Sequence, residues 1–125
     1  MGLTAEYVDN GTPGLLEAEI DAGRPVAVGW LHHGDLAKGE RPRGYGHWSV
    51  IVGYTDQFFI AHDPMGTPDF IHGGHKDQVE AKYVLYPRRQ WLKRWEVEGP
   101  GTGWAIRVTG GWSDSLKDDD ERYIE

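Results

Sequence analysis

The sequence predicts an α+β fold, in which a strongly bent antiparallel sheet carries short helices at its edges. Glycine occurs 18 times and proline 7 times among 125 residues, and this frequency favours short strands joined by turns over long helices. Two apolar runs in the middle of the chain follow each other at the distance of a hairpin. Hydrophobic residues make up 38% of the chain, which suffices for the one modest core of a single domain.

The N-terminal part predicts a strand followed by a helix. Residues 3–8 alternate loosely between apolar and polar side chains, as a strand does. Thr12 and Pro13 then supply a capping hydroxyl and a proline at the first helical position. We therefore expect a short amphipathic helix over residues 14–22, ended by Gly23 in a left-handed conformation.

The middle of the chain predicts a buried strand, a loop and a hairpin. The continuous apolar run 26–31 is typical of a strand that is buried on both faces. Residues 33–46 are rich in Gly, Lys, Arg and Pro, and they predict a surface loop. The runs 47–54 and 57–62 are rich in Val, Ile, Phe and Trp, and the break between them is too short for anything but a hairpin.

The C-terminal part predicts a long loop and two more strands around a short helix. Residues 65–80 are rich in Gly, His and Asp, which indicates an excursion loop. Residues 82–86 predict a strand, Pro87 starts a short helix, and residues 104–108 form the last expected strand.

That short helix combines aromatic and basic side chains. Trp91 and Trp95 stand one turn apart on the same face, and we expect them to anchor the core. The basic side chains are expected to form a solvated helix face; they are Arg88, Arg89, Lys93 and Arg94.

The charge balance argues against a nucleic-acid partner. The chain carries 13 basic and 20 acidic residues, a net charge of −7, which repels phosphate backbones. The acidic excess is concentrated near the C-terminus, so we expect one domain over residues 1–110 and an acidic tail over residues 111–125.

The absence of cysteine from the sequence limits its chemistry. It excludes disulfides, thiolate metal sites and a thiol nucleophile supplied by these 125 residues. No stretch approaches the ~20 apolar residues that cross a bilayer, and the N-terminal residues lack the pattern of a secretory signal. We therefore expect a cytoplasmic protein with no membrane association.

The hairpin brings a histidine and an aspartate together. If its turn is centred near Thr55, His47 and Asp63 lie directly opposite each other on one face. The carboxylate is then expected to accept the imidazole Nδ1–H and leave Nε2 free, which is how a general base is oriented. A register shift of one residue would place the two side chains on opposite faces.

Several segments together resemble a known family. GHWSVIVGY at 46–54 and FIAHDPMG at 59–66 are similar to motifs of the bacteriocin-processing (double-glycine-leader) cysteine peptidases and their peptidase-like relatives, within the papain superfamily. AGRPV at 22–26 is similar too, and WEVEGPGTGW at 95–104 resembles phage-encoded members. The resemblance covers roughly residues 3–108, and the two central motifs are fairly specific in combination.

The resemblance implies the sheet-bearing half of a papain-like fold. It makes His47 the general base of a Cys–His–Asp arrangement and Asp63 the residue that orients this base. The family carries its nucleophilic cysteine and an oxyanion-hole side chain on an N-terminal helical segment, and no residue of this chain matches either. Without that helical half, we expect an uncovered apolar sheet face beside His47, with Trp48, Trp30 and His32 as binding residues.

Two functions follow from these expectations. The first is a catalytically deficient, phage-encoded peptidase-like protein that binds a protein partner, or a second copy of itself, through the uncovered face. The alternative is the His/Asp half of a split cysteine peptidase whose cysteine comes from another polypeptide. A third possibility is that the coding sequence continues upstream of Met1 and includes the cysteine. Ser49 is no substitute nucleophile, because it lies on the same strand as His47 at a fixed spacing.

Four further histidines are expected to be solvated loop residues. His32-His33 and His72-Gly-Gly-His75 could be drawn as a zinc site. However, adjacent histidines on a strand point apart, and the two glycines argue against a helical ligand pair. We therefore expect neither a metal site nor a cofactor.

Overall fold

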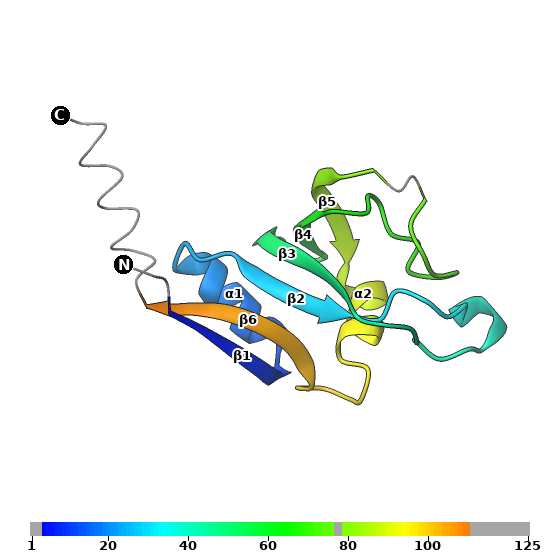
Figure 1. Ribbon diagram of the computed structural model, residues 1–125, viewed down its shortest axis with the longest axis horizontal. Helices are drawn as coiled ribbons and strands as arrows, with labels where there is room; N and C mark the ends of the chain where they lie inside the picture. Colours follow the sequence, from blue (N-terminus) through cyan, green and yellow to red (C-terminus); the bar gives the residue numbers. More distant parts are fainter. Residues whose placement is uncertain (1–3, 77–78, 111–125) are drawn as a thin grey trace.

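The computed structural model describes residues 4–76 and 79–110, so the expected acidic tail over 111–125 lies outside the described residues. The fold is α+β, which confirms the predicted class, and it contains one open antiparallel sheet (Figure 1). The strand order is β1-β6-β2-β3-β4-β5, so β1 and β5 are the edges. The strands are β1 (Thr4–Gly11), β2 (Val26–Trp30), β3 (His47–Tyr54), β4 (Phe58–Asp63), β5 (Ala81–Pro87) and β6 (Gly103–Gly110).

The helices α1 (Pro13–Asp21) and α2 (Arg88–Trp95) cover one face of this sheet (Figure 1). Both contribute to a single hydrophobic core, α1 with Leu16 and α2 with Trp91 and Trp95. The two indole rings stack with centroids 4.9 Å apart and are buried, which confirms that they anchor the core.

Helix α1 begins and ends at its predicted signals. The Thr12 hydroxyl accepts a hydrogen bond from the backbone N–H of Leu15 at 3.0 Å, and Gly23 follows the helix with a φ of 79°. Within the described residues, no helix has the length and apolar character needed to cross a bilayer.

Alternation along β3 divides the sheet into a covered and an uncovered face. His47, Ser49 and Ile51 are buried toward the helices, whereas Trp48 and Val50 point to the other side. The covered face carries the core, whose buried members are Leu16, Val26, Val28, Trp30, Ile51, Phe59, Ala61, Phe70, Val84, Tyr86, Trp91, Trp95 and Ala105.

The β3–β4 hairpin has a different register from the one predicted. The turn is longer than expected, because β4 starts at Phe58, and a bulge near Val52 compensates for only part of the difference. Val50 therefore lies opposite His62, so that Ser49, not His47, is level with Asp63. At this end of the hairpin the offset is two residues, an even number, and for this reason His47 and Asp63 still share one face of the sheet.

Arg94 is buried, which makes the expectation of a solvated basic face wrong for this residue. Its guanidinium donates hydrogen bonds to four backbone carbonyls in two loops: Leu31 (3.3 Å), His33 (2.8 Å), Gly34 (2.7 Å) and Phe70 (2.8 Å). Burial lowers the pKa of Arg94, and the carboxylates of Asp69 and Asp35 oppose this effect. From helical spacing, Arg94 was expected on the same solvated face as Arg89 and Lys93. Its burial was not predictable, because the carbonyl groups that it binds belong to loops that only the fold brings near α2.

We predict that Arg94→Lys destabilises the protein by about 2 kcal/mol, because an ammonium cannot reach all four carbonyls and leaves buried acceptors unpaired. Urea unfolding measures this difference. The matched control is Arg89→Lys on the exposed side of the same helix, which should change the free energy of unfolding by less than about 0.5 kcal/mol. Equal effects of the two substitutions would contradict the structural role of Arg94.

Candidate functional site

The carboxylate of Asp63 is the centre of the candidate site. It is fully buried and accepts four hydrogen bonds. Oδ1 accepts from Nε2 of His47 and from the backbone N–H of Met65, both at 2.9 Å. Oδ2 accepts from Nε2 of His75 at 3.2 Å and from the Tyr86 hydroxyl at 2.5 Å.

These donors come from separate parts of the chain. His47 is the first residue of β3, and Asp63 is the last residue of β4, at the same end of the hairpin. Tyr86 points to the covered face from the neighbouring strand β5, and His75 belongs to the loop between β4 and β5. The predicted contact between His47 and Asp63 is present, although it runs diagonally across the hairpin rather than between directly opposed residues.

The hydrogen bonds keep Asp63 ionised. Burial alone would raise the pKa of this carboxyl. The hydrogen bonds from His47, His75, Tyr86 and Met65 lower the pKa by a larger amount, so that it lies well below its usual range. The charge of Asp63 in turn contributes, after burial, to raising the pKa of Tyr86 far above its ordinary value. Tyr86 is therefore a permanent donor to this carboxylate.

The imidazole nitrogen that contacts Asp63 is the opposite of the one predicted. Nε2 of His47 faces the carboxylate, so Nε2 carries the proton and Nδ1 is left as the acceptor. Nδ1 makes no hydrogen bond with any of the residues in 4–76 and 79–110. The expected assignment failed because the pairing of strands fixes which side chains meet, but not which edge of a ring is turned toward its neighbour.

His32 and His75 lie beside His47, so the expectation that they are solvated loop residues is wrong. The side chain of His75 is fully buried, and its Nδ1 lies 3.5 Å from Nδ1 of His32. The His32 ring stacks on the His47 ring with centroids 4.9 Å apart. The other two loop histidines, His33 and His72, are exposed as expected.

The environment of His32 disfavours its charged form. Burial lowers the pKa of His32 to about 4, and the nearby imidazoles of His33, His47 and His75 act in the same direction. His32 is therefore neutral at physiological pH, with a lone pair on one ring nitrogen.

Two loops meet to bring these histidines together. The backbone N–H of Gly74 donates to the carbonyl of His32 at 2.5 Å, and Gly73 has a φ of 94°. A Cβ on Gly73 would lie 3.0 Å from the carbonyl oxygen of Gly34, so this close approach requires glycine. No periodic pattern in the sequence signals it, and the two glycines before His75 indicated only that a helical pair of ligands is absent from this segment.

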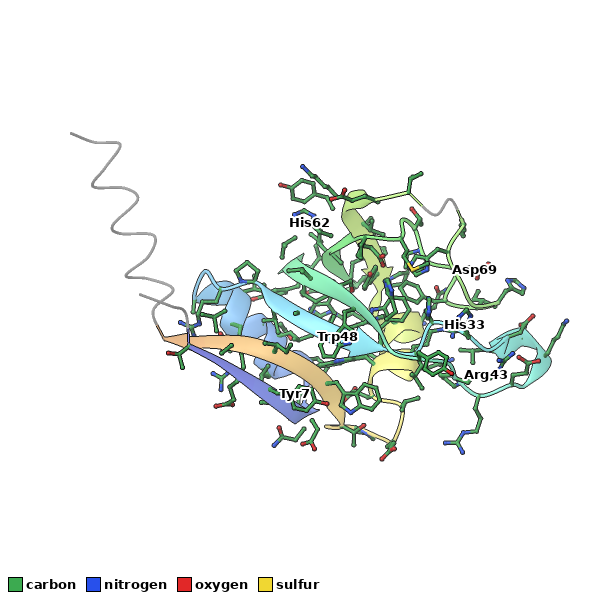
Figure 2. All side chains as sticks on the ribbon, in the orientation of Figure 1. Tyr7, His33, Arg43, Trp48, His62 and Asp69 are labelled. Atoms are coloured by element: carbon green, nitrogen blue, oxygen red, sulfur yellow. The ribbon has the colours of Figure 1, made fainter. Side chains whose placement is uncertain are left out.

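The three residues predicted to bind a partner occupy different environments. Trp48, labelled in Figure 2, lies on the uncovered face. Its exposed fraction is 38%, whereas that of Trp30 is 1%. The Trp30 ring meets the His47 ring edge-on at 5.0 Å and donates its Nε1–H to the Ser49 hydroxyl at 3.1 Å. His32 is half-buried within the histidine cluster. Trp30 therefore supports the site from inside the core.

The uncovered apolar face is not beside His47, as was expected, but on the opposite side of the sheet. His47 points toward the helices, and its neighbour Trp48 points away from them. A hollow of about 290 Å³ lies beside Trp48 on this face. Its lining includes Ala27, Val50, His62, Pro64 and Glu80, and Ser49 and Asp63 also contribute to it.

We predict that Asp63→Asn makes the stability less sensitive to acid. A carboxyl whose pKa is lowered by folding contributes stability above its unfolded pKa of about 3.9, and this contribution is lost as the pH falls toward the folded value. The wild-type free energy of unfolding should therefore decrease more steeply below pH 4 than that of Asp63→Asn. Urea unfolding between pH 7 and pH 2.5 measures both slopes, and equal slopes would contradict the assigned charge. An Asp56→Asn variant is the control, since it changes an exposed carboxyl in the turn between β3 and β4.

The comparison with protein-family models extends over most of the chain. Residues 7–99 match the model described as the Peptidase_C39 like family, and this range includes both His47 and Asp63. The searches of curated proteins and of solved structures each returned no match. The sequence motifs, the α+β fold and the family match agree with one another, and the chain belongs to the Peptidase_C39 like family.

Proposed function

We propose that this chain is a peptidase-like protein that does not cleave peptides by itself and that acts by binding a protein partner through the uncovered face of its sheet. The observation that carries the proposal is the apolar character of this face across five neighbouring strands. An origin in a phage genome and a cytoplasmic location stay predictions from the sequence.

The catalytic part of the proposal follows from the available nucleophiles. His47 and Asp63 form a base and its orienting acid, but the 125 residues contain no cysteine for this base to activate. Ser49 lies on the same strand as His47, and its hydroxyl is already hydrogen-bonded to Trp30. Hydrolysis by a water molecule alone, with no oxyanion hole, would be slow.

The binding part rests on the rows of side chains across the uncovered face. The register aligns Tyr7, Ile106, Ala27, Val50 and His62 in one row from β1 to β4. Tyr7 is 59% exposed and Ile106 is 38% exposed.

A second row places an aromatic side chain on either side of a glycine. Gly29 pairs with Trp104 on one side and with Trp48 on the other. The Trp48 ring lies directly over Gly29, and a Cβ on this glycine would lie only 2.7 Å from a carbon of the ring. Contiguous apolar surface of this kind, in a sheet whose helices lie on the other side, is typical of an interaction site.

We predict that Ile106→Glu weakens partner binding at least tenfold, because it buries a charge at the centre of the proposed interface. The measurement immobilises the chain at several concentrations and incubates it with an extract of the cells in which it occurs. Mass spectrometry then quantifies the protein that each concentration of wild type or variant retains. Tyr45→Glu is the matched control, since Tyr45 is 95% exposed in the loop before β3 and lies off the sheet.

Two outcomes would overturn the binding proposal. Captured proteins that are retained equally by both variants would show that the uncovered face is not the interface. The second outcome is self-association, which sedimentation velocity of the wild-type chain alone detects. Dimers that form with rising concentration and that Ile106→Glu abolishes would identify a second copy of the chain as the occupant of the face.

One observation favours the split cysteine peptidase as a second candidate. Nδ1 of His47 is the ring nitrogen that does not face Asp63, and it has no hydrogen-bond partner among the residues described. It could accept the proton of a thiol that a second polypeptide brings to the covered side of the sheet.

We predict that, if the split peptidase exists, a peptide with a thiol-reactive group labels a cysteine of the second polypeptide only when this chain is present. His47→Gln should then reduce the labelling rate by at least about 100-fold. His72→Gln, which changes an exposed loop histidine, is the control. Labelling that is independent of this chain would exclude the split enzyme.

A further inference from the structure

Three imidazoles from three separate segments lie next to one another. His32 follows β2, His47 begins β3, and His75 belongs to the loop between β4 and β5. One ligand atom from each lies within 4.8 Å of the other two. We propose that these three histidines form a binding site for one transition-metal ion with zinc-like preferences.

The carboxylate of Asp63 prepares two of the three ligands. It accepts Nε2–H of His47 through one oxygen and Nε2–H of His75 through the other. Both rings are therefore held in the tautomer that has a lone pair on Nδ1, and both lone pairs lie on the side away from Asp63. Metal-binding histidines characteristically donate their second ring N–H to a carboxylate in this way. The negative charge of the Asp63 carboxylate lies on the far side of these two imidazole rings from the proposed ion, and it would favour binding of a cation.

A tetrahedral ion can be bound after the His32 ring turns, because this ring stacks on the His47 ring and the nitrogen lone pairs lie in the ring planes. Nitrogen ligands at ~2.0–2.1 Å from zinc lie about 3.3–3.4 Å apart. The Nδ1 atoms of His32 and His75 are 3.5 Å apart in a hydrogen bond that the ion would replace, and the remaining distances of up to 4.8 Å need to shorten. His32 is the half-buried member of the cluster, so rotation of its side chain can supply this movement.

The backbone around His32 is fixed independently of any ion. The guanidinium of Arg94 holds the carbonyls of Leu31 and His33, on either side of His32. Gly74, next to His75, donates its N–H to the carbonyl of His32 itself. Because the loops are already positioned, little further ordering would oppose binding.

The donor set selects the class of metal. Three neutral imidazoles suit Zn²⁺, Co²⁺, Ni²⁺ or Cu²⁺, whereas Mg²⁺ and Ca²⁺ require oxygen ligands. Three histidines also leave a fourth position of the tetrahedron for water or a small ligand. The three histidines lie outside the lining of the hollow beside Trp48, so this inference does not depend on the proposed partner.

The test is calorimetric titration of the full chain, freed of metal with EDTA, with Zn²⁺ and in parallel with Mg²⁺. We expect one Zn²⁺ per chain and no binding of Mg²⁺. Co²⁺ at the same site should give the visible absorption of tetrahedral coordination. His32→Asn should weaken Zn²⁺ binding at least about 100-fold, and Asp63→Asn should weaken it roughly 10–100-fold.

Matched controls keep the result interpretable. His33→Asn and His72→Asn change exposed histidines nearby, and both variants should bind Zn²⁺ as the wild type does. Urea unfolding of His32→Asn in EDTA establishes that the variant is folded. The proposal is overturned if the wild type binds no Zn²⁺, or if His32→Asn binds it unchanged while the His33 and His72 variants lose it.

Discussion

The carboxylate of Asp63 has no access to water and must find all its hydrogen-bond donors inside the protein. A buried charge without such partners is strongly destabilising. Its four donors come from β3, from β5, from the turn after β4 and from the following loop. The need of one carboxylate for partners therefore determines the orientation of His47 and His75. Each ring turns Nε2 toward Asp63, and both rings lie beside His32.

Arg94 complements this arrangement with the opposite charge. Its guanidinium is buried at the end of α2, where it binds carbonyl groups in the loops that precede β3 and β5. Those two loops carry His32 and His75, neither of which belongs to a strand. Helix α2 anchors the core through Trp91 and Trp95. It also positions the two loops, because Arg94 in its last turn points toward them.

Local signals in the sequence predicted the elements and the meeting of His47 with Asp63, but not the rest of the site. The hairpin register differs from the predicted one, yet the contact survived because the displacement at this end is two residues and keeps His47 and Asp63 on one face. Which nitrogen of His47 faces Asp63 depends on ring rotation, which strand pairing does not determine. His75 and Arg94 could not be assigned, since a glycine-rich loop has no periodicity and the burial of a charge depends on distant carbonyls.

The alternation of β3 separates the two surfaces that the sheet offers. His47 and Ser49 face the helices, whereas Trp48 and Val50 face the opposite side. A partner that covers Trp48 would therefore not touch the His47 ring, and it would leave Nδ1 open. A polypeptide that delivers a thiol to Nδ1 must instead approach from the covered side, past His32. An ion held by His32, His47 and His75 would occupy that same nitrogen, so metal binding and thiol activation exclude each other, while partner binding on the uncovered face is compatible with either.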